Sequence, residues 1–396
     1  MNRDEGRRAI EDLCGLLTNG APNWVANRVS KWKSFEVAFG LIGYRAPDAP
    51  KHPLVRALAE YEYWVDGGPM TAAVQDVLGA GAAITAFKSD WQGRERWLSK
   101  RLQDPNGCLQ ALFEIRTAFY LRQIGNSVKY LAPRQEPGPD LRLVNDGESV
   151  WAECTLTSPG GGQAIPRPAA NQIARALLRE MQRSGCQRLV FLRCRRELRP
   201  SDGDRLIAEL RRMLPAVSTA PTELLDGRYV ARVLFGGARV CPITWSRAQQ
   251  LQQWMQAAPF CMGGIIPLDR RVSAPFGRYL AQGVAVASEV PDRSIEHLVD
   301  AALEKRHQLP ANAPGIVFAG FGHPLSAQVS TGRRLHAQLA GQVAERWANH
   351  PEISGVAFLL APRASGGQFL ETRVVVHHFT NVMSRFKLPP NFTWTM

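Results

Sequence analysis

Two acidic residues, Asp140 and Glu153, flank a segment whose sequence predicts a tight hairpin. The dipeptide Asp146-Gly147 lies between two apolar runs, which is a strong signal for a two-residue turn. With that dipeptide at the centre of the turn, Leu143 faces Val150 and Asp140 faces Glu153. The two carboxylates would then lie opposite each other on one face of a sheet, with their β-carbons about 5 Å apart.

Opposed carboxylates repel each other, so a bound cation or a raised pKa must compensate. Mg²⁺ takes oxygen ligands and is commonly held by one or two carboxylates and several waters. Such an ion can activate water and stabilise charge on a phosphate. Glu114, on a predicted helix before the hairpin, would add a third carboxylate if that helix packs on the sheet. The alternative is an exposed hairpin with an incidental acid pair, and a slip of one residue would separate the acids.

The elements that must position these acids follow from apolar spacing. Residues 111–124 have the spacing of a helix, and Gly125 is typical of a helix C-terminus. Strands are expected over 128–131, 141–144 and 150–156. The rest of the chain alternates between expected helices (54–64, 70–78, 169–183, 206–214, 295–308 and 333–348) and expected strands (188–194, 229–235, 315–319, 356–360 and 373–379). This alternation predicts an α/β or α+β fold.

Four segments are expected along the chain. Residues 1–105 are predicted to form a helical N-terminal domain, and residues 106–215 the core that carries the acids. Residues 216–290 show no clear period and are interpreted as an insertion or linker. Residues 291–396 form a C-terminal α/β portion, whose strands either complete the core sheet or make a separate domain.

The acidic segment resembles the PD-(D/E)xK signature of the restriction-endonuclease-like nucleases. The resemblance lies in Gly138-Pro139-Asp140-Leu141 and Val150-Trp151-Ala152-Glu153-Cys154-Thr155, and in the preceding helix with Glu114. It implies a mixed sheet flanked by helices. It also implies Mg²⁺ (or Mn²⁺) held by Asp140, Glu153 and Glu114, and hydrolysis of phosphodiester bonds in nucleic acid, with DNA favoured over RNA.

The sequence departs from the signature at one position. The superfamily has a lysine two residues after the second acid, which helps to position or activate water, and this chain has Thr155 there. Another lysine could serve, with Lys129 preferred over Lys305. Alternatively the metal suffices and Thr155 orients water, or the site is degenerate and the protein binds nucleic acid without cutting it. We favour an enzyme, a Mg²⁺-dependent endonuclease.

The charge of the chain favours a polyanionic partner. Its 396 residues include 48 Lys and Arg against 35 Asp and Glu, a net charge of +13. A basic protein gains affinity for nucleic acid through counterion release, and arginine binds phosphates with two parallel hydrogen bonds. The alternative is a solvated basic surface. The residues expected to contact nucleic acid are Arg193, Arg195, Arg196, Gln172, and, on a helix with interleaved tryptophans, Arg94 and Arg101.

Other classes of protein are disfavoured. The sequence has no run of 18 apolar residues, the length that predicts a membrane-spanning helix. The polar start of the chain and seven cysteines without a pattern favour a cytoplasmic protein with reduced thiols. The motifs of P-loop ATPases, serine hydrolases, zinc proteases and zinc fingers are missing from the sequence. One further hypothesis remains, a protein-interaction subunit of a bacterial anti-phage defence assembly, acting as a homo-oligomer or with a partner protein.

Overall fold

The computed structural model of the chain supports description of most, but not all, of its residues. The described residues are 3–19, 23, 25–27, 52–65, 72–91, 94–105, 107–131, 138–145, 147–157, 162–163, 165–184, 187–214, 220–237, 243–258, 260–267, 279–321, 333–360 and 375–394.

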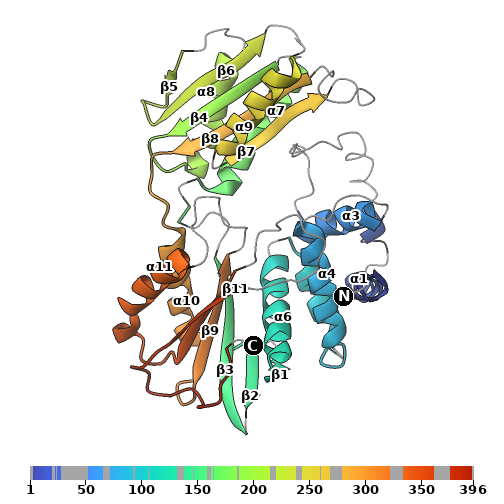
Figure 1. Ribbon diagram of the computed structural model, residues 1–396, viewed down its shortest axis with the longest axis vertical. Coiled ribbons are helices and arrows are strands. Elements are labelled where there is room, and N and C mark those ends of the chain that lie inside the picture. The colour runs from blue at the N-terminus through green and yellow to red at the C-terminus, as the bar shows by residue number, and fades with distance from the viewer. Residues whose placement is uncertain are drawn as a thin grey trace.

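The protein is a mixed α/β structure whose described strands form two mixed sheets (Figure 1). The strand order in the first sheet is β1-β2-β3-β9-β10-β11 and in the second β5-β6-β4-β8-β7. The strands of the first sheet are β1 (Ser127–Tyr130), β2 (Leu141–Asn145), β3 (Glu148–Thr157), β9 (Gly315–Phe321), β10 (Gly355–Leu360) and β11 (Val375–Thr380). Those of the second are β4 (Gln187–Cys194), β5 (Thr222–Leu224), β6 (Tyr229–Gly237), β7 (Phe260–Pro267) and β8 (Tyr279–Ser288).

Helices surround both sheets. Those before the first sheet are α1 (Arg3–Thr18), α3 (Pro53–Val65), α4 (Ala72–Ala86), α5 (Glu95–Gln103) and α6 (Cys108–Gln123). Those of the second sheet are α7 (Arg167–Arg183), η1 (Pro200–Asp202), α8 (Gly203–Met213) and α9 (Trp245–Ala257). Those after it are α10 (Ser294–Glu304), η2 (Lys305–Gln308), α11 (Arg333–Ala344) and η3 (Trp347–Asn349).

The N-terminal helices and the first sheet share one hydrophobic core. Ile115 on α6 and Leu98 on α5 are fully buried together with Val150 and Ala152 of β3. α6 ends as expected, because Gly125 has a φ of +95°, a left-handed conformation that favours glycine. The helical N-terminal portion therefore packs directly on the strands that carry the acids.

The β2–β3 hairpin has the register that the Asp-Gly turn predicts. Leu143 pairs with Val150 and Leu141 pairs with Ala152, in antiparallel register. Gly147 has a φ of +83°, as this kind of turn requires. The printed ladder ends at Leu141 and Ala152, and Asp140 and Glu153 are the next residue on each side of it.

The C-terminal strands complete the sheet that contains the hairpin. β3 pairs in parallel with β9, with Glu153 beside Val317, and β9 pairs in parallel with β10. A parallel pair requires a crossover connection, and α10 supplies part of it. α10 and α11 cover the face opposite α6, where Val317 is buried. Of the two arrangements considered for residues 291–396, the single sheet is the one observed.

The boundary expected between residues 106–215 and 216–290 does not coincide with the division between the sheets. β4, expected beside the acids, lies in the second sheet between β6 and β8. β4 pairs with β6 on one edge and with β8 on the other, and both of these strands come from residues 216–290. β8 is not predicted from the sequence, because its alanine and valine residues are buried on both faces of the sheet and apolar residues do not alternate with polar ones.

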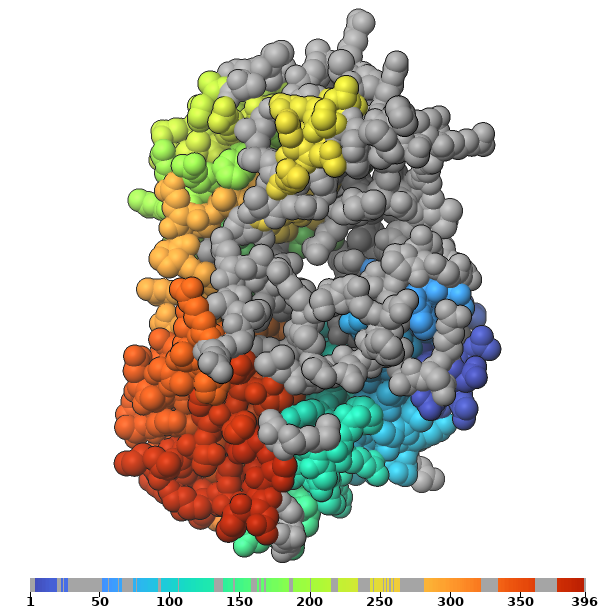
Figure 2. All heavy atoms as spheres, in the orientation of Figure 1, coloured from blue at the N-terminus to red at the C-terminus, as the bar shows by residue number. Residues whose placement is uncertain are grey.

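The described residues between positions 158 and 290 thus form a unit inserted between β3 and α10, and we call this stretch of the chain the inserted unit. The two connections meet where the Arg293 N–H donates to the Gly162 carbonyl oxygen at 2.7 Å. A β-carbon on Gly162 would lie 2.5 Å from the Arg293 oxygen, so this approach needs glycine. In the space-filling view the described atoms of the inserted unit, green to yellow, lie at the top, and the N-terminal helices and C-terminal strands at the bottom (Figure 2). No helix in the described ranges is long and apolar enough to span a membrane.

Candidate metal centre

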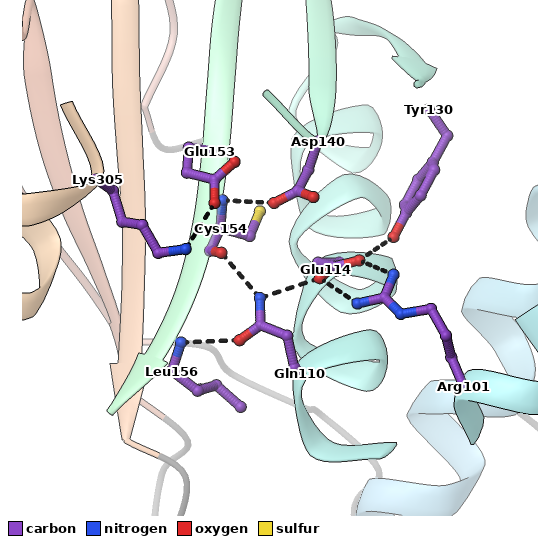
Figure 3. A network of polar contacts seen from close by, with 9 residues as sticks. All are labelled: Arg101, Gln110, Glu114, Tyr130, Asp140, Glu153, Cys154, Leu156 and Lys305. Carbon is purple, nitrogen blue, oxygen red and sulfur yellow. Dashed lines mark hydrogen bonds and ion pairs between the residues drawn. The ribbon is translucent and has the colours of Figure 1, made fainter. Parts of the chain in front are cut away.

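The candidate site forms where β2 leaves β3 and side chains replace the missing strand partner. The Cys154 N–H donates to Asp140 Oδ2 at 2.9 Å. The Gln110 amide donates to the Cys154 carbonyl oxygen at 2.8 Å and accepts from the Leu156 N–H at 3.0 Å. Figure 3 shows these contacts along the edge of β3. Together they hold the backbone around Glu153 in place after the β2 ladder has ended.

Glu153 is 2% exposed, and a lysine from another part of the chain contacts it. Lys305 Nζ lies 3.1 Å from Glu153 Oε1. With its nitrogen turned toward the carboxylate, the Gln308 amide donates to Glu153 at 2.8 and 3.2 Å and accepts from Lys305 at 2.8 Å. Lys305 and Gln308 begin and end the short helix η2. The Lys305 side chain is 30% exposed, so it lies between the buried Glu153 carboxylate and the solvent.

The two acids share a buried and electrostatically strained environment. Burial, together with the negative charges of Glu114 and Glu153, raises the pKa of Asp140 to about 9. Burial also raises the pKa of Glu153, to about 7, although Lys305 opposes the shift. Without a cation, the pair therefore keeps a proton at neutral pH.

This strain predicts that the stability of the cation-free protein falls as pH rises. Both pKa values are raised on folding, so the native state binds more protons than the unfolded state between about pH 4 and 9. Each retained proton gives a slope of about −1.4 kcal/mol per pH unit in the free energy of unfolding. Urea unfolding in EDTA from pH 6 to 9 should show this loss, and Asp140→Asn should reduce it. A bound divalent cation replaces the proton, so Mg²⁺ should stabilise the unsubstituted chain more at pH 9 than at pH 6. An equal Mg²⁺ effect at both pH values would contradict the assignment.

The donors of Asp140 and Glu153 fit a hard divalent cation. Both supply carboxylate oxygens, from the residues next to the last pair of the β2–β3 ladder, and their mutual repulsion favours a positive ion between them. Within the described ranges, no group of three or more His, Cys, Asp and Glu side chains is arranged to hold a metal. Two carboxylates are nevertheless enough for Mg²⁺, which usually keeps several waters.

Glu114, expected as a third metal ligand, is instead saturated by protein donors. Arg101 donates to both of its oxygens, at 2.6 and 2.7 Å. Tyr130 Oη donates at 2.6 Å and Gln110 Nε2 at 3.0 Å. A carboxylate accepts about four hydrogen bonds, so Glu114 has no lone pair left for a cation. Its role in this arrangement is to anchor Gln110 and the N-terminal helix α5 at the edge of the site.

The two positions considered in place of the signature lysine have different outcomes. Thr155 is buried on the same face of β3 as Glu153 and makes no hydrogen bond with either acid. Lys129 is exposed on β1, and β2 lies between that strand and β3. This position gives the preference for Lys129 no support, and among the described lysines Lys305 is the one that contacts Glu153.

The residues expected to contact nucleic acid are not gathered at this site. Arg101 is held by Glu114, and its guanidinium lies 5.0 Å from the centre of the Trp97 ring. Trp91 is buried in the core, and Trp97 is partly buried against the same core. Arg94 precedes α5 and is half-buried. The others lie in the inserted unit: Gln172 on α7, and Arg193, Arg195 and Arg196 at the end of β4.

Three residues of the network were not anticipated from the sequence. Gln110 precedes Glu114 by four residues, a spacing that puts both on one face of α6 and that could have revealed it. Tyr130 lies near the site because β1 pairs with β2, and the sequence of the hairpin alone does not predict this pairing. Gln308 reaches Glu153 because η2 packs against β3, and no local feature of the sequence predicts this tertiary contact.

Comparison of the chain with protein-family models, with curated proteins and with solved structures finds no match.

Proposed function

We propose that this protein is a metal-dependent nuclease that hydrolyses phosphodiester bonds in nucleic acid, with DNA favoured. The observation that carries the proposal is the contact between Lys305 and Glu153, 152 positions apart in the chain. It puts a lysine beside Glu153, one of the two acids, although Thr155 occupies the signature position. The sequence has no lysine between Lys129 and Lys305, so the contact between Lys305 and Glu153 does not result from a high number of lysines in this part of the chain.

The roles of the chain's own residues follow from their positions. Asp140 and Glu153 would hold a divalent cation, which when bound supplies positive charge to a phosphate and favours deprotonation of water. Lys305 places a second positive charge beside Glu153, where it can donate a hydrogen bond to a phosphate oxygen or to a water. Gln308 orients the Lys305 ammonium through its amide oxygen. Gln110 and Asp140 hold the β3 backbone that carries Glu153.

A second candidate function is nucleic-acid binding without cleavage. Thr155 favours it, because a side chain without a charge occupies the position from which the signature lysine acts. In that case Lys305 and Gln308 stabilise a carboxylate pair that holds no catalytic ion.

The proposal is tested by a cleavage panel. Supercoiled plasmid, linear duplex, single-stranded DNA and RNA are incubated with the protein in Mg²⁺, Mn²⁺ or EDTA, beside Asp140→Asn. We expect cleavage in the divalent ions only, lost in the variant by about 1,000-fold or more. Binding without cleavage in any ion would favour the second candidate. Neither binding nor cleavage would contradict both and leave an interaction subunit.

A further inference from the structure

The inserted unit carries most of the positive charge of the chain. Residues 158–290 contain 19 arginines, no lysine and nine acidic residues. Their net charge is therefore +10, against +13 for all 396 residues. A basic charge concentrated in one structural unit, and supplied by arginine alone, is the electrostatic pattern of a phosphate-binding surface.

Part of this charge is neutralised at the end of the second sheet. Arg195 lies 2.7 Å from Glu223, and Arg193 lies 3.4 Å from Glu289. Arg228 lies 3.6 Å from Asp202. Of the arginines at the end of β4 that the sequence singled out, Arg193 and Arg195 therefore face nearby acids.

The helical face of the inserted unit differs. α7 and α8 lie side by side over the core of the second sheet. Gln172 approaches Gly203, and Glu180 pairs with Arg211 at 3.7 Å. Both pairs are 31 residues apart, so the two helices run parallel and their C-terminal ends lie together.

Three arginines on these helices are exposed and have no acidic partner among the described residues. They are Arg183 at the end of α7, and Arg205 and Arg212 on α8. Arg205 and Arg212 are seven residues apart, about 10 Å along the helix. That length corresponds to about three steps of 3.4 Å along a nucleic-acid strand. Positive charge at a helix C-terminus also stabilises the helix, but Arg205 lies in the first turns of α8 and gains nothing from this effect.

We propose that the outer face of α7 and α8 is the surface by which the inserted unit binds the phosphate backbone of nucleic acid. The inference rests on the proposed function, because it names how the substrate is held. The unit's two connections meet at Gly162 and Arg293, between β3 with Glu153 and α10 leading to Lys305. Nucleic acid bound to the helical face is thereby tethered next to the elements that carry both halves of the candidate site.

The test is the salt dependence of binding in the full chain. In an Asp140→Asn background, which prevents cleavage, Arg183, Arg205 and Arg212 are all replaced with glutamine. A matched control replaces Arg8, Arg96 and Arg334, which are exposed on α1, α5 and α11. Fluorescence anisotropy with labelled duplex DNA and single-stranded RNA is measured from 50 to 300 mM salt. Equal urea midpoints for the two triple variants confirm that both fold.

For the nucleic acid that binds, the α7–α8 variant should lower the slope of log K against log salt by about three, one for each lost phosphate contact. Its Kd should rise roughly tenfold or more over that of the control. Equal slopes and affinities for the two triple variants would overturn the inference and leave the nuclease proposal standing. Weakened binding by the α7–α8 variant in a protein that never cleaves would uphold the inference while removing the nuclease function. No binding at 50 mM salt by the Asp140→Asn parent would overturn the inference and remove nucleic acid as substrate.

Discussion

Lys305→Met is expected to lower the rate of nucleic-acid cleavage by about 100-fold or more, while the protein remains folded. The reason is that Lys305 is the cation that contacts Glu153, at 3.1 Å. Loss of a positioned charge or proton donor at a reacting centre typically costs 10²- to 10⁴-fold in rate. Lys305 also opposes the rise in the pKa of Glu153, so the variant's activity should begin at higher pH than that of the unsubstituted chain. The measurement is the single-turnover rate against pH in saturating Mg²⁺.

Lys129→Met is the matched control for this experiment. It removes the same charge from an exposed residue on β1, on the far side of β2 from β3. It should leave the rate and the pH profile unchanged. Loss of activity in Lys129→Met together with full activity in Lys305→Met would contradict the assignment and return the role to the residue that the sequence favoured.

Arg101→Met is expected to lower the free energy of unfolding by about 3 kcal/mol. Glu114 is 2% exposed, and Arg101 donates to both of its oxygens. Removing one partner of a buried ion pair leaves an uncompensated charge, at a cost of about 3–5 kcal/mol. The lower value applies because the Arg101 side chain is 26% exposed, and because Tyr130 and Gln110 still donate to Glu114. Urea unfolding of the full chain measures the change.

Two further variants isolate the ion pair from other effects of the substitution. Arg96→Met removes an exposed arginine from the same helix, α5, and should change the stability little. Adding Glu114→Gln to Arg101→Met removes the buried charge and should recover part of the loss. A loss below about 1 kcal/mol for Arg101→Met alone would show that Glu114 is not the anchor described here.

The local structure around the acids was predictable because its signals are local. The Asp-Gly turn sets the register of β2 and β3, and that register puts Asp140 and Glu153 next to its last pair, Leu141 and Ala152. The helix before it follows from apolar spacing and from Gly125. These features need only neighbouring residues, so a single sequence contains them.

The rest of the site depends on contacts between distant parts of the chain. Lys305 is adjacent to Glu153 because β9 pairs in parallel with β3 after an insertion of more than a hundred residues. The spacing of residues along the sequence does not predict such a contact. Glu114 has a side chain of the kind that binds metal ions, but Arg101 and Tyr130 donate hydrogen bonds to it. Arg101 was expected to contact nucleic acid because the sequence does not reveal this ion pair. Burial and partners, rather than residue type, separate these roles.

We propose that Asp140 and Glu153 together hold one divalent cation. The most direct test is the binding of Mn²⁺ to the full chain at pH 8, followed by electron paramagnetic resonance. Asp140→Asn and Glu153→Gln are compared with Glu148→Gln, which removes an exposed acid from the same strand. We predict one Mn²⁺ per chain in the unsubstituted protein and in Glu148→Gln, and its loss in each of the other two variants. Undiminished Mn²⁺ binding by either Asp140→Asn or Glu153→Gln would contradict the claim.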